Sequence, residues 1–232
     1  MKIYLIPCPI AENTSSDVLS PQILAAIQQT THFLVENVRT ARRFISELKL
    51  GIQIDELIFE ILDKDTQPGI VTDFYKKHAA VEYIGIISEA GCPGVADPGA
   101  LAVSIAQQQG FEVIPLVGPS SILLGLMGSG FSGQNFAFIG YLPIDKAERI
   151  RKIEQLDREV SKGGQTQIFI ETPYRNNALL EDLIAQCAPD SFICIACDVT
   201  APSGFVQTKK AQDWAKAQPD LHKKPCIFLL GK

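Results

Sequence analysis

Short apolar runs alternate with amphipathic helical patterns along the whole chain. Apolar runs of about four to eight residues between turn residues are typical of strands, and apolar spacings of three and four predict helices. In the first half, strands are predicted in KIYLI, HFLVE, VEYIGIIS and FEVIPLV, and helices over residues 17–29, 39–48, 68–78 and 98–109. In the second half, helices are predicted over 120–127 and up to about residue 162, with strands in NFAFIGYL, TQIFIE, SFICIACDV and KPCIFLLG. This alternation predicts an α/β fold with largely parallel strands.

The stretch VGPSS, which begins at Val117, divides this pattern into two halves of similar size. A glycine and a proline there suit a hinge, and either following serine can cap the next helix. The exposed N–H groups of that first helical turn can bind polar atoms of a ligand. We therefore expect two domains, residues 1–117 and 118–232.

Composition and charge limit the class of protein. Of the 232 residues, 46% are hydrophobic and 20% are charged, which is typical of a globular protein. The first apolar run ends at Pro7 and is too short for a signal peptide or a membrane span, so we expect a cytoplasmic protein with no membrane partner. The net charge of −5 disfavours tight nonspecific binding to nucleic acid, although a local basic face remains possible.

The six cysteines are expected to be reduced thiols, because no secretory signal accompanies them. Cys194 and Cys197 form a CIAC pair, but they lie in a predicted strand and no second cysteine or histidine pair completes a site. We therefore expect no metal site.

The glycine- and proline-rich stretch SEAGCPGVADPG, residues 88–99, directly follows a predicted strand. Glycine lets the backbone approach a ligand closely and proline stiffens the loop, so it is either a ligand-binding floor or an ordinary connection. It contains no lysine or arginine, and its ionisable residues are Glu89 and Asp97. Such a loop suits a ligand with positive charge or hydroxyls better than a phosphate, and S-adenosylmethionine carries both.

A second glycine-rich stretch, GSGFSG at residues 128–133, matches the spacing of a dinucleotide-binding fingerprint. That fingerprint needs a strand before it and a helix after it. Here a predicted helix precedes it and a strand follows, so NAD or FAD binding is not expected.

Six motifs in order resemble the tetrapyrrole-methylase superfamily: YLIPCPI, ISEAGCPGVADPG, VIPLVGPSS, SGFSGQNFAFIGYLP, ERIRKIEQL and IFIETPYRNNALLEDL. Within it, they are most similar to the branch that methylates the 2′-hydroxyl of a cytidine in small-subunit ribosomal RNA. The resemblance runs from residue 3 to the last strand. It implies an S-adenosylmethionine-dependent methyltransferase with two α/β domains, a cofactor cleft between them and usually a homodimer.

The resemblance also implies the site residues. The methionine end of the cofactor is expected to meet the first loop, and neighbouring polar atoms to meet two serines of the VGPSS motif. A second-domain wall around the adenine is expected from FIETP and DVTAP, although a buried strand and its turn are an alternative explanation. The expected cofactor-binding residues are Ser88, Ala90, Gly91, Cys92, Pro93, Gly94, Val95, Ser120, Ser121, Ile170, Glu171, Thr200 and Ala201.

Methyl transfer to a ribose hydroxyl needs a base near the methyl group. The carboxylates within matched motifs are Glu36, Asp97 and Glu171. Glu36 and Arg39 match the E-D-T-R segment of the family and are the expected catalytic pair. Arg39, Arg42 and Arg43 could also hold RNA phosphates, whereas a solvated helix face is the simpler reading.

The chain departs from the family at two places on the acceptor side. Asn37 and Val38 replace an acid and a hydroxyl, and PIAENTSSD, residues 9–17, replaces the usual G-N-L-x-D pattern. Three functions therefore compete. They are methylation of ribosomal RNA, methylation of a tetrapyrrole or another small molecule, and binding of RNA or cofactor without catalysis.

Overall fold

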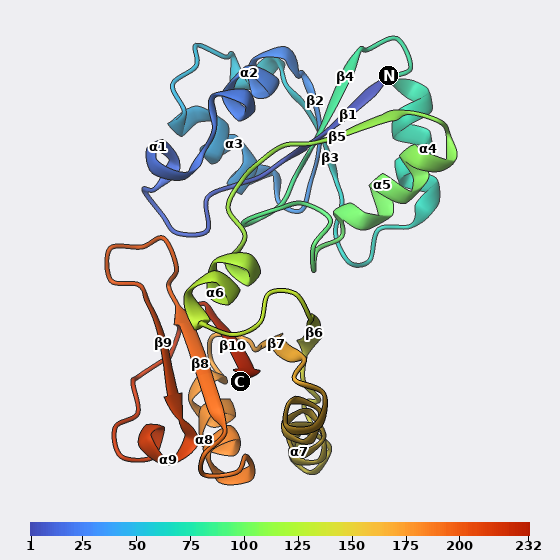
Figure 1. Cartoon of the computed structure of the whole chain (residues 1–232). Coiled ribbons are helices and arrows are strands. Elements are labelled where there is room, and N and C mark those ends of the chain that lie inside the picture. Colours follow the sequence, from blue (N-terminus) through green and yellow to red (C-terminus); the bar gives the residue numbers. More distant parts are fainter. The chain divides into compact units, whose positions relative to one another are not determined.

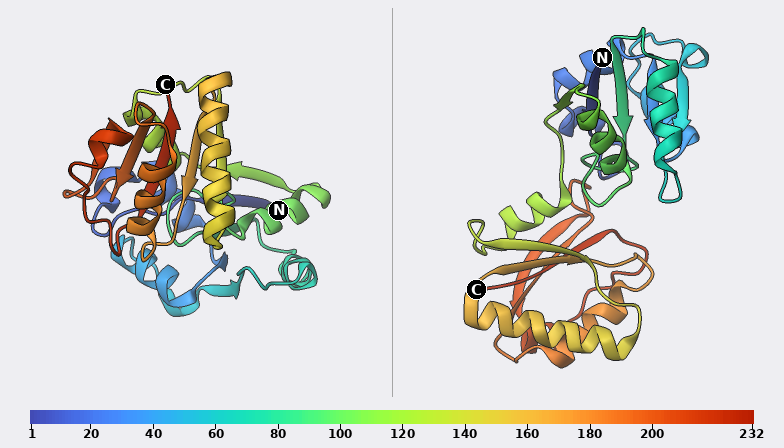
Figure 2. Two further views of the ribbon diagram at one scale, coloured as in Figure 1. Left: turned by 90° about the horizontal axis from the view of Figure 1, so that it is seen from below. Right: turned by 90° about the vertical axis from the view of Figure 1, so that its right-hand side faces the viewer.

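The computed structural model describes all 232 residues, which form two compact units, Met1–Ser120 and Ser121–Lys232 (Figures 1 and 2). The division follows Ser120, whereas the sequence analysis put the boundary before Gly118. Each unit contains one five-stranded sheet. No helix in either unit combines the length and the apolar character that crossing a lipid bilayer requires.

The first unit contains a fully parallel sheet in the order β3-β2-β4-β1-β5. Its strands are β1 (Lys2–Ile6), β2 (His32–Val35), β3 (Ile58–Ile61), β4 (Tyr83–Ile87) and β5 (Glu112–Pro115). Its helices are α1 (Ser15–Val18), α2 (Pro21–Gln29), α3 (Val38–Glu47), the 3₁₀ turn η1 (Ile54–Glu56), α4 (Pro68–Lys77) and α5 (Gly99–Gln108). Four of these strands and three of the α-helices were predicted with nearly these bounds.

Helices cover both faces of this sheet, which explains its apolar strands. In β2, Phe33 and Val35 belong to the core cluster formed with α2 and α3, whereas Leu34 belongs to the cluster formed with α4 and α5. Figure 1 shows these two helix pairs on opposite sides of the sheet. A strand buried on both faces has apolar residues at successive positions, as β2 does.

The second unit contains a mixed sheet in the order β6-β7-β10-β8-β9. Its strands are β6 (Phe136–Tyr141), β7 (Thr166–Ile170), β8 (Phe192–Cys197), β9 (Phe205–Lys210) and β10 (Cys226–Gly231). Its helices are α6 (Ser121–Ser129), α7 (Lys146–Gly163), α8 (Asn176–Gln186) and α9 (Ala211–Trp214). The GSGFSG stretch spans the end of α6 and the loop before β6, so a helix precedes it and a strand follows, as predicted.

The expectation of largely parallel strands is confirmed for the first unit and wrong for the second. Only β6 and β7 pair in parallel there, while β10 runs antiparallel to β7 and β8, and β8 runs antiparallel to β9. Residues 198–204 connect β8 to β9 without a helix. A connection that short joins antiparallel strands, because a parallel pair needs a longer crossover.

Two helix starts follow from local chemistry. The single helix predicted over residues 17–29 is divided into α1 and α2, because Pro21 cannot donate a backbone hydrogen bond and therefore begins a new helix. At the start of α3, the Asn37 side chain accepts hydrogen bonds from the N–H groups of Arg39 and Thr40. Asparagine is among the strongest helix N-caps, so this departure from the family pattern supports the helix.

Candidate functional site

Three strands of the first unit end together at the candidate site. Ile6 of β1 and Val35 of β2 both pair with Ile87, the last residue of β4. The residues that follow these strands therefore meet at the carboxyl edge of a parallel sheet, which is where such sheets commonly bind ligands. Glu36 follows β2 and Ser88 follows β4, so the fold brings the predicted catalytic carboxylate to the predicted cofactor loop.

The loop of residues 88–99 is held by internal hydrogen bonds. Asp97 Oδ1 accepts from the N–H groups of Gly94 at 2.5 Å and Gly99 at 2.9 Å. The buried Ser88 hydroxyl donates to the Gly91 carbonyl at 3.2 Å. Gly91 also exchanges two backbone hydrogen bonds with Cys8, which lies just beyond β1. These bonds within the loop and to Cys8 define the shape of the loop.

Gly91 adopts a backbone conformation that other residues resist, with φ of +71°. A Cβ atom added there would lie 3.3 Å from the Pro119 carbonyl oxygen. The Cys92 thiol donates a hydrogen bond to the same oxygen at 3.3 Å. Two segments expected to bind the cofactor, the loop and the VGPSS motif up to Ser120, thus lie against each other within the first unit.

Glu36 is the carboxylate best suited to accept a proton in this cluster. Burial raises the pKa of its carboxyl above the ordinary value, and the negative charges of Asp97 and Glu89 raise it further. The backbone of Glu89 acts in the opposite direction on that pKa, so the Glu36 carboxyl lies close to the start of the loop.

The other two candidate carboxylates are occupied by structural contacts. Asp97 holds two loop N–H groups, as described above. Glu171 Oε1 accepts from Arg175 Nη2 at 2.5 Å and from the Thr172 N–H at 2.6 Å. Both carboxylates therefore stabilise their loops, which leaves Glu36 as the candidate base.

The candidate residues of the second unit lie at one end of its sheet, where β7 and β8 end and β10 begins. Ile170 at the end of β7 pairs with Ile227, and Cys197 at the end of β8 pairs with Cys226, the neighbouring residue of β10. The segments after β7 and β8 therefore lie one strand apart. The predicted pairs Ile170 with Glu171 and Thr200 with Ala201 belong to these segments.

Thr200 has two features that point to a ligand. Its φ of +75° is a strained conformation for a β-branched residue. Its buried hydroxyl has no hydrogen-bond partner in the protein, and the same is true of Arg175 Nε, in the segment after β7. Buried polar atoms without partners are costly, and strain of this kind gathers at binding sites.

Replacing Thr200 with glycine is expected to stabilise the fold and weaken cofactor binding. Relief of the positive φ should raise the free energy of unfolding by about 1 kcal/mol after the entropy cost of glycine. Loss of one hydroxyl contact should reduce S-adenosylmethionine affinity about 2- to 10-fold. Thermal unfolding and calorimetry measure both effects.

Lys49→Gly is the control for this change, because Lys49 has φ of +52° and belongs to none of the candidate segments, which are the loop of residues 88–99, the VGPSS motif and the segments after β2, β7 and β8. It should stabilise the fold without affecting cofactor binding. An unchanged affinity in Thr200→Gly would show that the hydroxyl does not contact the cofactor.

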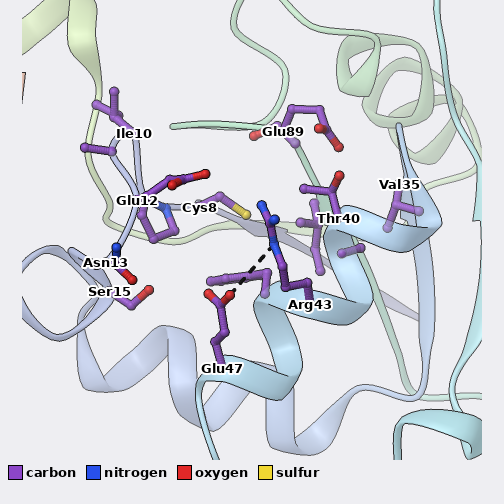
Figure 3. A pocket seen from close by; sticks show the side chains of 16 residues that line it. Cys8, Ile10, Glu12, Asn13, Ser15, Val35, Thr40, Arg43, Glu47 and Glu89 are labelled. Carbon is purple, nitrogen blue, oxygen red and sulfur yellow. Dashed lines mark ion pairs between the residues drawn. The ribbon is translucent and has the colours of Figure 1, made fainter. Parts of the chain in front are cut away.

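A cavity of about 340 Å³ opens beside the loop of residues 88–99 (Figure 3). Its walls come from the segment after β1, from α3 and from the first two residues of the loop, Ser88 and Glu89. Polar side chains on these walls are Glu12, Asn13, Ser15, Thr40, Arg43 and Glu47. The first three belong to the departure at residues 9–17, and Arg43 was a candidate for RNA phosphate, whereas Thr40 and Glu47 were not predicted from the sequence.

The arginines of α3 and α7 differ in their surroundings. Arg42 lies with its guanidinium 5.7 Å from the Phe59 ring centre and 3.9 Å from Asp55. Arg43 lines the cavity and lies 3.7 Å from Glu47. Arg149 of α7 is buried against Asp182 at 2.8 Å, so it holds α7 to α8 and does not face solvent.

Curated relatives of the chain share the name "Ribosomal RNA small subunit methyltransferase I". The protein of that name from Leptospira borgpetersenii is 36% identical over 200 residues, which cover 85% of this chain and 76% of that protein. The protein from Vibrio cholerae is 27% identical, with 88% of this chain and 67% of the relative covered. The chain spans from 57% to 76% of the length of such relatives. No protein-family model matches.

Solved structures share the fold over the entire chain. The methyltransferase CobJ has a TM-score of 0.64 and 19% identity, with 92% of it covered. Uroporphyrin-III C-methyltransferase from Thermus thermophilus, complexed with S-adenosyl homocysteine, has a TM-score of 0.60 and 14% identity, with 98% covered. Both similarities cover 100% of this chain. The predicted tetrapyrrole-methylase fold is therefore confirmed.

Proposed function

Because the chain belongs to the ribosomal RNA small subunit methyltransferase I family, we propose that it methylates a ribose 2′-hydroxyl of small-subunit ribosomal RNA. The methyl donor in this proposal is S-adenosylmethionine. The observation that carries it is the position of Glu36, a carboxyl with a raised pKa that follows β2 and lies beside the stiff loop that begins at Ser88. A base beside a rigid ligand-binding loop is what methyl transfer to a hydroxyl requires.

The residues that hold the donor in this proposal are the candidate residues of each unit described above. The loop residues Ser88, Ala90, Gly91, Cys92, Pro93, Gly94 and Val95 hold its methionine end, with Ser120 and Ser121 on neighbouring polar atoms. The loop has no cation, so it does not repel a sulfonium. Ile170, Glu171, Thr200 and Ala201 line the adenosine, where Thr200 supplies its unpartnered hydroxyl.

The proposed chemistry is an in-line displacement. S-adenosylmethionine supplies an electrophilic methyl group on a sulfonium, which is a good leaving group. The ribose oxygen forms the new bond to carbon while the sulfur keeps the electron pair of the broken bond. Glu36 accepts the hydroxyl proton. Arg39, in the first turn of α3, is the residue that we propose positions that carboxylate.

Transfer of labelled methyl from S-adenosylmethionine tests the proposal against its alternatives. The protein is mixed in turn with small ribosomal subunits, total RNA and a small-molecule pool that contains tetrapyrroles. Label in the RNA supports the proposal, whereas label only in small molecules would favour the tetrapyrrole alternative. Donor binding without transfer to any pool would identify a binding module.

Calorimetry tests the donor by itself. S-adenosylmethionine and its demethylated product should bind with similar, micromolar affinity, or about −8 kcal/mol. NAD and ATP should not bind, because the loop lacks a phosphate-binding cation. An acceptor on ribosomal RNA implies action in the cytoplasm, and the family resemblance favours a homodimer; both stay predictions.

Arg42→Ala is expected to weaken RNA binding and reduce its salt dependence. The Arg42 side chain is 44% exposed, and its ion pair with Asp55 at 3.9 Å is too weak to hold it. Loss of one phosphate contact should flatten the slope of log affinity against log salt by about 0.7 to 0.9. RNA titrations at several salt concentrations measure this slope.

Arg42→Lys is the matched control, because it keeps the charge and should keep the slope. Donor affinity should be unchanged in both variants. An unaltered slope in Arg42→Ala would mean that this arginine belongs to a solvated helix face.

A further inference from the structure

We propose that the cavity beside the loop holds the base of the acceptor nucleotide, and that Arg43 and Glu47 select cytosine there. This inference rests on the proposed function, because it places the base of the ribose that is methylated. The cavity and the loop share a wall, formed by Ser88 and Glu89. A ribose positioned at that wall can extend its base into the cavity.

Arg43 and Glu47 are available for a ligand. The guanidinium and carboxylate are 3.7 Å apart, beyond hydrogen-bond distance, and their side chains are 63% and 58% exposed. An exposed pair of this kind contributes less than about 1 kcal/mol, so exchanging it for contacts with a base costs little. The two residues therefore offer a donor and an acceptor side by side.

The polar residues of α3 line the cavity in a fixed order. Thr40, Arg43 and Glu47 are spaced by three and four residues, so they lie on one face of the helix. The helix begins next to Glu36, which lies beside the start of the loop, and Glu89 of that loop lines the cavity. Figure 3 shows Glu89, Arg43 and Glu47 in this order across the cavity. Arg43 is thus nearer the loop, and Glu47 lies about 6 Å further along α3.

This order matches the polar edge of cytosine. With its ribose at the loop, cytosine presents first the O2 and N3 acceptors and then the N4 amino group, which is farthest from the sugar. Arg43 can donate two parallel hydrogen bonds to the acceptors, and Glu47 can accept from the amino group. Uracil would place its N3–H donor against Arg43 and its O4 acceptor against Glu47, and guanine would place an amino group against Arg43 and O6 against Glu47.

The charge of the cavity also favours a base over a phosphate. Glu12, Glu47 and Glu89 line it, and Arg43 is the only cation among the lining residues. Phosphate in such a cavity would be repelled, whereas an uncharged ring with an exocyclic amino group is not. Enzymes that act on one nucleotide commonly read its unstacked base in a pocket.

The test uses nucleosides, so that it is independent of catalysis. Cytidine and uridine are titrated into the isotopically labelled full chain saturated with S-adenosylhomocysteine, and NMR shifts are followed. Cytidine should bind with millimolar affinity, at least about 10-fold more tightly than uridine. The shifts should cluster at Thr40, Arg43 and Glu47. Equal affinities, no binding, or shifts elsewhere would overturn the inference.

Variants separate recognition of the base from the general charge of the cavity. Glu47→Gln should reduce the preference for cytidine, because its amide can also donate to O4 of uridine, while the N3–H of uridine still faces Arg43. Glu154→Gln is the matched control, since Glu154 forms the same type of pair with Arg158 on α7, in the other unit. It should keep the preference.

Methyl transfer to small ribosomal subunits, measured with the same variants, distinguishes failure of the proposed function from failure of the base pocket. Cytidine selectivity without transfer to RNA would contradict the proposed function and leave the base pocket standing. Transfer by the unmutated chain that is unaffected by Glu47→Gln, together with unselective nucleoside binding, would contradict only the base pocket.

Discussion

Gly91→Val is expected to reduce S-adenosylmethionine affinity at least about 100-fold while the protein stays folded. Valine resists the φ of +71° at this position, which costs about 1–3 kcal/mol locally. Its Cβ would also lie 3.3 Å from the Pro119 carbonyl oxygen, so the loop and the VGPSS segment must move apart. The micromolar affinity expected for the unmutated protein should then weaken beyond about 100 µM in calorimetry.

Gly110→Val separates the loss of binding from the loss of backbone freedom. Gly110 has nearly the same φ, +70°, but a Cβ there meets nothing within 4 Å, and the residue lies between α5 and β5. Both variants should lose the stability that a positive φ costs a valine, Gly91→Val should lose more because of the Pro119 contact, and only Gly91→Val should lose donor binding. A folded Gly91→Val protein that binds the donor normally would mean that the loop is an ordinary connection.

Glu36→Gln is expected to lower the rate of methyl transfer about 10²- to 10⁴-fold with donor affinity unchanged. The amide keeps the size of the side chain and a carbonyl oxygen that can face the Glu89 backbone, but it cannot accept the hydroxyl proton. Single-turnover transfer to small ribosomal subunits measures the rate. Glu56→Gln, at an exposed carboxylate in η1, should have no effect.

The pH dependence gives a second signature of Glu36. The base must be deprotonated, so the rate should rise with pH through the pKa of Glu36, which lies above the value of about 4.3 for an unperturbed glutamate. Stability should respond in the opposite direction. Because the folded-state pKa is raised, the folded protein binds more protons than the unfolded chain, and this group reduces stability as pH rises through that pKa.

Glu36→Gln should therefore increase the free energy of unfolding at neutral pH, and this difference should shrink as the pH falls through the raised pKa. Denaturant unfolding at several pH values measures it. A variant that is slower and also less stable at neutral pH would indicate a structural role for Glu36.

The sequence predicted the first unit better than the second, and the reason lies in the strands. The buried parallel strands β1, β2 and β4 are continuous apolar runs, so their pattern is strong. The strand β3 was missed because it is a short edge strand in which Glu60 interrupts the apolar residues. The strand β9 is also an edge strand, and its sequence FVQTKK has too few apolar residues to show alternation.

The candidate site was predictable where a motif carried it. The loop at residues 88–95 and Glu36 were found from motifs, and their proximity then follows from strand register, which a single sequence does not display. The cavity residues Thr40 and Glu47 were not found, because a polar residue on an exposed helix face has the same pattern whether it faces water or a ligand. The unpartnered Thr200 hydroxyl likewise becomes visible only in three dimensions.

Nucleoside analysis of labelled RNA tests the central claim most directly. Small ribosomal subunits are incubated with the protein and methyl-labelled S-adenosylmethionine, and their RNA is digested to nucleosides and separated by chromatography and mass spectrometry. The account predicts label in a single 2′-O-methylated nucleoside, 2′-O-methylcytidine, and its loss with Glu36→Gln. Label on a base, or no label in RNA beside active transfer to a small molecule, would contradict it.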